Sequence, residues 1–308
     1  MEDNGRFDIV TGSFGFTGRY ITRLLLEKGI RVRTLTNHPN KPNPFGSPVE
    51  VFPYNFDEPG KMVEAMRGAH TVYNTYWVRF NYGRTSYGQA VANVENLIRA
   101  AVEAKVKKFV HISIANPVEP EPGSLDYYTG KWVMENALKE SGLDYAIIRP
   151  TLIYGPEDIL INNIAYFLRR FPFFAVPGDG SYRVQPVYIE DVARLAVELS
   201  ESKDNVVCDA VGPEIYSFRE LVHSIKKHTG GRAIVLKAPR IAAYLCSRML
   251  DPLVKDVVLI WGEVTRLMEE RLVSRHPPLC STRFSEWIRA NGGSVGVKYS
   301  SELERHFK

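Results

Sequence analysis

The chain has 308 residues, a formal net charge of +4 and three cysteines. This length exceeds what one small core needs, so we expect one large domain or two interlocked ones. The mild, scattered positive charge argues against nucleic-acid binding, and charged residues break the apolar stretch 241–261, which argues against a membrane span. The cysteines lie far apart in the sequence and read as buried or free thiols in a reducing compartment. Because the leader "MEDNGRF" is polar, with no targeting pattern, we expect a cytoplasmic protein.

The first half of the chain alternates short β-branched runs with amphipathic helical patterns, which is typical of parallel strands joined by crossover helices. The expected strands are residues 7–11, 31–36, 49–55, 70–76, 107–113 and 143–150. The expected helices are residues 17–29, 58–68, 88–104 and 130–142. This order predicts the α/β class, with a doubly wound parallel sheet of the Rossmann type and ligands at the carboxyl ends of the strands.

The rhythm of the sequence changes after Pro150. Residues 161–174 read as an amphipathic helix, 177–189 as a turn leading into an extended segment, and 205–212 as one more strand. From Pro213 onward the pattern is mostly helical, with a short strand at 233–237. We therefore expect a Rossmann domain over residues 1–155, joined by a returning segment at about 182–212, and a smaller, mostly helical lobe over 156–308.

Three glycines follow the first expected strand at a spacing of three residues, in "VTGSFGFTGRY". Gly12 permits a tight turn, Gly15 lets the backbone approach a pyrophosphate, and Gly18 lets the helix pack on the strand. The amino end of the next helix then offers N–H groups to the phosphates. The residues expected to bind a dinucleotide here are Gly12, Ser13, Phe14, Gly15, Phe16, Thr17 and Gly18.

The string "TGSFGFTGR" resembles the TGxxGxxG form of the short-chain dehydrogenase/reductase superfamily. Further segments that resemble it follow in the family's order: "HISIAN", "YYTGK", "RPTLIYGP" and "GDGSYRVQPVYIEDVA". The chain is most similar to the atypical, extended-like group, which includes epimerase/dehydratase-type and NmrA-like NAD(P)-binding proteins. The resemblance implies a Rossmann fold and a nicotinamide dinucleotide, and it covers about Val10 to Ala193.

"YYTGK" supplies a tyrosine and a lysine, Tyr127 and Lys131, which share one face of a helix because they are four residues apart. A cation beside a phenol lowers the phenol's pKa, so the tyrosine can act as an acid or base near neutral pH. The resemblance implies that Tyr127 is catalytic and that Lys131 also bonds the nicotinamide ribose. It further implies that Ser113 orients a substrate oxygen. Ile114 and Ala115 follow where many members carry further hydroxyl residues, so this role falls to Ser113, to Asn116 or to no residue.

The resemblance also assigns residues at other strand ends. It implies that Asn74 and Thr75 back the cofactor ribose, that Asp57 lies on the adenine side, and that Pro150 belongs to the sixth-strand Arg-Pro signature near the cofactor. Behind Thr75, residues 76–84 ("YWVRFNYGR") are aromatic and basic. They read equally well as a substrate-side loop or as a packed aromatic surface.

The end of the second expected strand bears on which dinucleotide is used. A carboxylate there would bond the ribose 2′-OH of NAD, but the sequence has Asn37 and His38 instead. The missing acid, with Arg19, Arg33 and Lys41 nearby, slightly favours NADP(H) over NAD(H). No histidine or cysteine falls in a metal-like spacing, so we expect no metal.

Two functions fit these residues. The first is an NAD(P)-dependent oxidoreductase or epimerase acting on a small hydroxyl or carbonyl compound, with Tyr127 and Lys131 as the acid-base pair. The second is a non-catalytic NAD(P)-binding protein, a redox sensor or an assembly subunit that keeps the fold. The intact tyrosine–lysine pair favours the first. The expected partner is a small molecule, and a homodimer is compatible with the sequence.

Overall fold

A computed structural model describes residues 5–83 and 85–306 of the chain, so that the first four residues of the leader and Arg84 lie outside the described residues. The chain divides into two units. The first comprises Met1–Pro150 and Val192–Cys208, and the second comprises Thr151–Asp191 and Asp209–Lys308. The first boundary thus falls five residues before the expected one, and the returning segment is shorter than expected.

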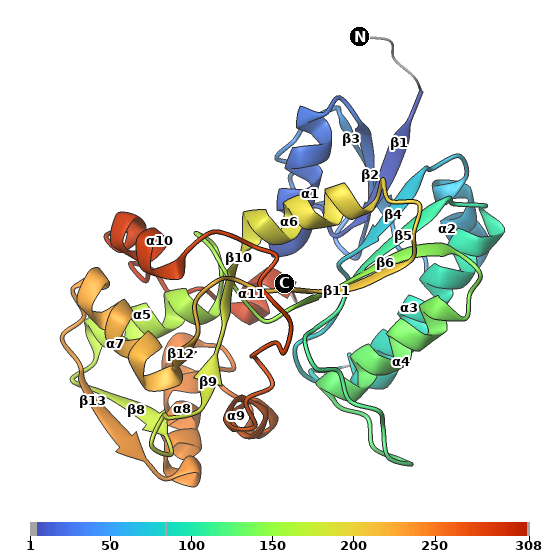
Figure 1. The fold of residues 1–308 in the computed structure, drawn as a ribbon. Helices are drawn as coiled ribbons and strands as arrows, with labels where there is room; N and C mark the ends of the chain where they lie inside the picture. The colour runs from blue at the N-terminus through green and yellow to red at the C-terminus, as the bar shows by residue number, and fades with distance from the viewer. Residues whose placement is uncertain (1–4, 84, 307–308) are drawn as a thin grey trace. The chain divides into compact units, whose positions relative to one another are not determined.

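The first unit is built on a seven-stranded sheet with the order β11-β6-β5-β4-β1-β2-β3 (Figure 1). Neighbouring strands from β6 to β3 pair in parallel. The strands are β1 (Phe7–Thr11), β2 (Arg31–Thr36), β3 (Val49–Pro53), β4 (Thr71–Asn74), β5 (Lys108–Ile112), β6 (Asp144–Pro150) and β11 (Val206–Ala210). The predicted α/β fold class is confirmed. Because strand order reverses between β1 and β4, their carboxyl ends form the crevice where such sheets bind ligands.

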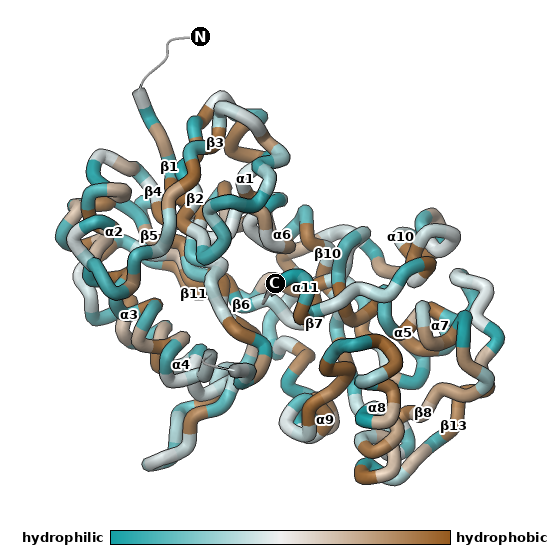
Figure 2. The backbone as a smooth tube through the Cα atoms, turned by 180° about the vertical axis from the view of Figure 1, so that it is seen from behind, coloured by the Kyte–Doolittle hydropathy of each residue, from teal (hydrophilic) through white to brown (hydrophobic). Residues whose placement is uncertain are grey.

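Helices cover both faces of this sheet (Figure 1). They are α1 (Phe16–Glu27), α2 (Pro59–Met66), α3 (Tyr87–Glu103), α4 (Tyr127–Lys139) and α6 (Ile189–Leu199). Helices α2, α3 and α4 bury apolar side chains such as Met62, Leu97 and Leu138 against Ile9 and Phe109 of the sheet. Figure 2 shows the same division, with hydrophobic colour on inner strands and alternating colour along the outer helices. Burial on both faces explains why the strands read as continuous apolar runs.

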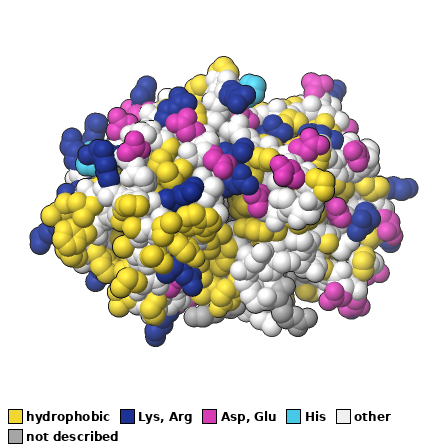
Figure 3. All heavy atoms as spheres, turned by 90° about the horizontal axis from the view of Figure 1, so that it is seen from below, with side chains coloured by type: hydrophobic (Ala, Val, Ile, Leu, Met, Phe, Trp, Pro, Cys, Tyr) yellow, Lys and Arg dark blue, Asp and Glu magenta, His cyan; other side chains and the backbone are white. Residues whose placement is uncertain are grey.

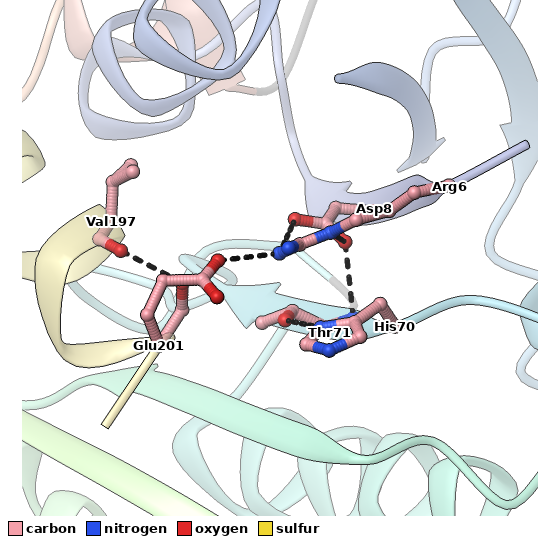
Figure 4. Close-up of polar contacts among 7 residues, drawn as sticks. Arg6, Asp8, His70, Thr71, Val197 and Glu201 are labelled. Atoms are coloured by element: carbon pink, nitrogen blue, oxygen red, sulfur yellow. Dashed lines mark hydrogen bonds and ion pairs between the residues drawn. The ribbon is translucent and has the colours of Figure 1, made fainter. Parts of the chain in front are cut away.

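A polar cluster fixes the returning segment at the amino ends of β1 and β4 (Figure 4). Arg6 donates to Asp8 at 3.3 Å and to Glu201 at 2.7 Å, and buried Asp8 accepts the backbone N–H of Thr71. Burial raises the pKa of Asp8, and the charge of Arg6 offsets only part of this rise. These charges lie at the strand ends opposite the glycine turn, so they support the fold and lie apart from the ligand edge.

The second unit mixes helices with three two-stranded sheets, which pair β10 with β7, β12 with β9 and β13 with β8. Its strands are β7 (Leu152–Tyr154), β8 (Phe173–Pro177), β9 (Arg183–Val184), β10 (Pro186–Tyr188), β12 (Tyr216–Ser217) and β13 (Ile234–Ala238). Its helices are α5 (Leu160–Arg170), α7 (Phe218–Thr229), α8 (Arg240–Val254), α9 (Trp261–Met268), α10 (Phe284–Asn291) and α11 (Glu302–His306). None of the helices among the described residues is long and apolar enough to cross a membrane.

One expected helix was too long. The segment 161–174 is helical only as far as Arg170, and Phe173–Pro177 is strand β8. Pro172 ends the helix because it has no N–H and disfavours the helical conformation of the residue before it. The β8 strand pairs in parallel with β13, beginning at Phe173 beside Ile234. A partner about sixty residues later in the chain explains why the local pattern did not show this strand.

Candidate functional site

The glycine turn lies between β1 and α1, at the carboxyl edge of the sheet. Gly12 has a φ of +68°, which favours glycine, and its carbonyl accepts the N–H of Gly15 at 2.8 Å. A Cβ at Gly18 would overlap the carbonyl group of Gly12, so Gly18 is required for the helix to pack this closely. A Cβ at Gly15 would meet only that carbonyl oxygen, at 3.2 Å. The outer side of Gly15 is therefore open to a ligand.

The other residues of the turn divide between support and surface. Ser13 is fully buried, and its N–H donates to Thr34 Oγ1 at 3.0 Å, which ties the turn to β2. Phe14, Phe16 and Thr17 are half-buried at the start of α1. Among the described residues, no side chain caps the amino end of α1, and its first turn contains no acidic residue. The positive end of the helix is thus left for an external anion.

Beside the turn, the ends of β1, β4 and β5 are joined by a buried polar network. Thr11 donates to Asn74 Oδ1 at 3.2 Å, and Asn74 Nδ2 lies 3.0 Å from His111 Nδ1. Thr75 donates its hydroxyl proton to the carbonyl of Thr11. Asn74 Oδ1 also accepts the N–H of Tyr76, so the amide nitrogen faces His111. Asn74 and Thr75, the residues predicted to lie beside the ribose, are therefore at the crevice and hold the ends of β1, β4 and β5 together.

In this network the Asn74 amide donates to His111 Nδ1, so the neutral His111 ring carries its proton on Nε2. Burial holds its pKa well below the usual value, and the charge of Lys131 lowers it further. Its Nε2, like Trp77 Nε1, is buried without a hydrogen-bond partner among the described residues. His111 is the second-last residue of β5, and Trp77 follows the end of β4 by three residues. Buried donors left unsatisfied by the protein are uncommon and are consistent with a ligand that supplies acceptors.

Tyr127 and Lys131 occupy the first two turns of α4, which begins at a capping box formed by Asp126 and Thr129. Trp77, from the loop after β4, contacts both residues. Its ring centroid lies 5.8 Å from that of Tyr127 and 5.0 Å from Lys131 Nζ. A Cβ at Gly130 would collide with this indole, so glycine at that position lets Trp77 pack against both the tyrosine and the lysine. The predicted pair thus shares one aromatic wall.

Lys131 is buried, and its Nζ donates to the carbonyl of Ile112 at 2.8 Å. Burial lowers its pKa from 10.5 to about 7, while the charge of Glu135 opposes that change. A lysine with this pKa changes charge near neutral pH. Such a shift is common where a lysine takes part in binding or proton transfer.

Ser113 lies close to this pair in the sheet but has a different partner. It is buried, and its hydroxyl donates to Glu135 Oε1 at 2.6 Å. Arg149 forms two hydrogen bonds to the same carboxylate, at 2.9 and 2.5 Å. The Ser113 hydroxyl is therefore committed to a charged group within the protein, which leaves it poorly placed to orient a substrate oxygen. Asn116, the alternative, follows three residues later at a φ of +53°.

We expect Arg149→Met to lower the free energy of unfolding by about 2 kcal/mol, because it leaves the buried Glu135 charge without its bidentate partner. Lys139, at 3.6 Å, retains part of the attraction. Urea denaturation measures the change. The matched control is Arg183→Met, which removes an exposed pair with Glu270 and should cost clearly less, because solvent screens that pair. Equal losses in the two variants would contradict a special role for the buried carboxylate.

Comparison with known proteins identifies the domain that carries these residues. Residues 12–164 match the model of a family described as NAD(P)H-binding. They form a domain of the NAD(P)H-binding family. The chain is 25% identical over 223 residues to NADH dehydrogenase [ubiquinone] 1 alpha subcomplex subunit 9, mitochondrial, of Arabidopsis thaliana, covering 69% of this chain and 55% of that one. The chain thus spans little more than half the length of that relative.

Two further likenesses concern reductases. The ceramide reductase of Caulobacter vibrioides is 25% identical over 246 residues, which cover 79% of this chain and 76% of that enzyme. The structure of triphenylmethane reductase from Citrobacter sp. superposes with a TM-score of 0.73 at 16% identity, covering 92% of this chain and 99% of that one. The resemblance read from the motifs is confirmed at the level of a nicotinamide-dinucleotide-binding family with reductase relatives.

The NAD(P)H-binding domain fits a dinucleotide on three observations of its own geometry. The outer side of Gly15 is open, the amino end of α1 has no side-chain cap among the described residues, and buried donors without protein acceptors lie along the carboxyl edge. Asn37 and His38 follow β2 at this edge, and Asp57 is exposed in the turn between β3 and α2. Pro150 ends β6, where its carbonyl accepts the N–H of Ala115.

The structure corrects one part of the reasoning on cofactor choice. Arg33 lies within β2 and bonds Glu50 at 2.7 Å and the carbonyl of Ala65. Its guanidinium also stacks over the ring of Phe7, 4.0 Å from the ring centroid. Phe7 begins β1, at the end of the sheet opposite the glycine turn. Arg33 is thus held away from the ligand edge and cannot favour a 2′-phosphate there.

Sequence reasoning missed three residues that shape this site. Trp77 was noted only as one member of an aromatic loop, whose last residue, Arg84, lies outside the described residues. His111 appeared only as the first residue of "HISIAN", and Glu135 was not singled out. The sequence signals for these residues were weak. The contact between Trp77 and Gly130, for example, cannot be predicted without knowing the fold. Glu135, however, lies four residues after Lys131, and this helical spacing could have identified it.

Proposed function

We propose that this chain is an NAD(P)-dependent oxidoreductase or epimerase that acts on a small hydroxyl or carbonyl compound. The observation that carries the proposal is the convergence of Tyr127 and Lys131 on Trp77, on the helix that follows β5. A bound nicotinamide dinucleotide would supply hydride chemistry. Gly12, Gly15 and the amino end of α1 would hold its pyrophosphate, while Asn74, Thr75 and Lys131 would face its ribose.

The protein's own part in the reaction is proton handling. Tyr127 would give a proton to, or take one from, the substrate oxygen through its phenolic OH. When charged, Lys131 would stabilise the phenolate form of Tyr127 and so lower the free-energy cost of proton release. Trp77 would shield both side chains from water, which strengthens their electrostatic interaction.

A second candidate is a non-catalytic NAD(P)-binding subunit. Two observations favour it: the Ser113 hydroxyl is taken by Glu135, and one relative is a subunit of NADH dehydrogenase. Both candidates need the dinucleotide, and we propose a slight preference for NADP(H) because no acid follows β2. A cytoplasmic location and a homodimer remain sequence-based predictions.

The cofactor part of the proposal is tested at Gly15. A valine side chain there would fill the open space beside the turn, so Gly15→Val should weaken NADPH binding at least tenfold, or about 1.4 kcal/mol. Titration calorimetry with NADPH and NADH measures both the loss and the preference. Gly60→Val is the matched control, because a Cβ at Gly60 meets nothing within 4 Å. Unchanged affinity in a folded Gly15→Val protein would remove the dinucleotide from this turn.

A further inference from the structure

Helix α8 in the second unit buries small side chains and exposes large apolar ones. Its buried side chains are small, Ala243 and Ser247. Its large apolar side chains recur every fourth residue and are 55% to 77% exposed: Ile241, Leu245, Met249 and Leu253. A helix of a water-exposed surface normally buries its large apolar stripe. The stripe on α8 is therefore available to something other than the core of this unit.

Neighbouring elements extend this stripe into a continuous apolar surface. Phe173 on β8 and Ile234 and Leu236 on β13 are exposed on two paired strands, of which β8 contacts α8. Trp261 of α9 is exposed beside Tyr244 of α8, with ring centroids 5.6 Å apart. Figure 3 shows hydrophobic side chains gathered over this part of the molecule. We call the set Phe173, Ile234, Leu236, Ile241, Leu245, Met249, Leu253 and Trp261 the α8 face.

The α8 face is flanked by positive charge. Residues 232–255 contain five lysines or arginines and one aspartate, a net charge of +4, which equals that of the whole chain. Arg240 lies over the ring of Trp261, 4.9 Å from the ring centroid, and Lys237 and Lys255 are exposed. An apolar stripe with basic side chains at its edges matches the water–hydrocarbon boundary of an anionic lipid surface. A tryptophan at the edge of the stripe is also typical of that boundary.

We propose that the α8 face docks this protein on the surface of an anionic lipid bilayer. Helix α8 would lie in the plane of the interface, with Leu245 and Met249 among the acyl chains and the basic side chains reaching the headgroups. A second copy of the chain fits less well. A two-fold contact would place Arg240 of one helix near Lys255 of the other if the two α8 helices ran antiparallel, and near Arg240 of the other if they ran parallel, so that like charges would meet in both cases. This inference goes beyond the proposed function and does not depend on it.

The test is co-sedimentation of the full chain with vesicles of phosphatidylcholine alone or of equal parts phosphatidylcholine and phosphatidylglycerol. The protein should bind the anionic vesicles at least about tenfold more strongly, and added salt should weaken this binding. Leu245→Gln/Met249→Gln should reduce binding to anionic vesicles by about tenfold or more, because it removes the apolar contact. Glutamine is a good helix former, and both positions are mostly exposed, so the fold should persist.

Two further variants separate charge from general surface effects. Lys237→Gln/Lys255→Gln should remove most of the preference for anionic over neutral vesicles. Ile215→Gln/Val297→Gln changes two half-exposed apolar residues outside the α8 face and should bind as the unaltered protein does. Protein that stays in the supernatant with both vesicle types overturns the proposal. A Leu245→Gln/Met249→Gln variant that binds vesicles normally also overturns it. The same holds if sedimentation equilibrium shows that the unaltered protein is a dimer, that it binds no vesicles, and that the substitutions only convert this dimer to monomers.

Discussion

Replacing Tyr127 by phenylalanine is expected to lower turnover by about a hundredfold to ten thousandfold, the usual contribution of a positioned acid or base. Phenylalanine retains the ring that packs edge-on against Trp77 and, at 6.5 Å between centroids, against Tyr87. The variant therefore removes the proton donor and little else. Cofactor affinity should stay within about twofold, because the glycine turn and Lys131 remain. Hydride transfer with a panel of carbonyl and alcohol substrates measures the first quantity, and calorimetry measures the second.

Tyr128 provides the matched control for this experiment. It is the next residue of α4 but is buried, whereas Tyr127 is half-exposed at the first position of the helix. Tyr128→Phe should leave turnover nearly unchanged. Full activity in Tyr127→Phe would refute the assignment of the acid-base residue. A normal protein that binds the dinucleotide yet transfers no hydride across a broad panel would favour the non-catalytic subunit.

The parts of the site that the sequence predicted are those set by local pattern. The glycine turn depends on three residues within one turn of chain, and Tyr127 and Lys131 depend on a single helical spacing. Both can be read without knowing where any other element lies. The parallel sheet followed for a similar reason, since buried strands are apolar runs separated by amphipathic helices.

The features that the sequence did not predict depend on partners that are distant along the chain. Ser113 bonds a carboxylate twenty-two residues later, and nothing in the sequence "HISIAN" indicates where that carboxylate lies. Arg33 was linked to the ligand edge because it is close in sequence to Asn37, but it lies within β2, and Phe7 and Glu50 hold its side chain away from the carboxyl edge. Strand β8 was missed because its pairing partner, β13, lies about sixty residues away.

Lys131 connects the stability of the fold to the proposed chemistry. Its pKa is 10.5 in the unfolded chain and about 7 when buried. Between those two pH values the unfolded chain binds one more proton than the folded chain, so the free energy of unfolding rises with pH across this window. Below about pH 7 the folded protein carries the whole cost of a buried charge, and above about pH 10.5 that cost is absent.

Lys131→Met should therefore make the protein more stable and less active at the same time. At about pH 6 we expect a gain of about 3 kcal/mol in the free energy of unfolding, because the cost of the buried charge outweighs the lost contacts to Ile112 and Trp77. The gain should disappear as the pH approaches 10, which urea denaturation across this range measures.

Turnover of the Lys131→Met variant should fall by about a hundredfold and its cofactor affinity by about tenfold, since Lys131 is proposed to serve both the phenol and the ribose. A variant that loses stability at pH 6 would show that Lys131 is held for packing, whereas one that gains stability and keeps full turnover would remove it from the chemistry. Only a lysine retained for its charge predicts the gain and the loss together.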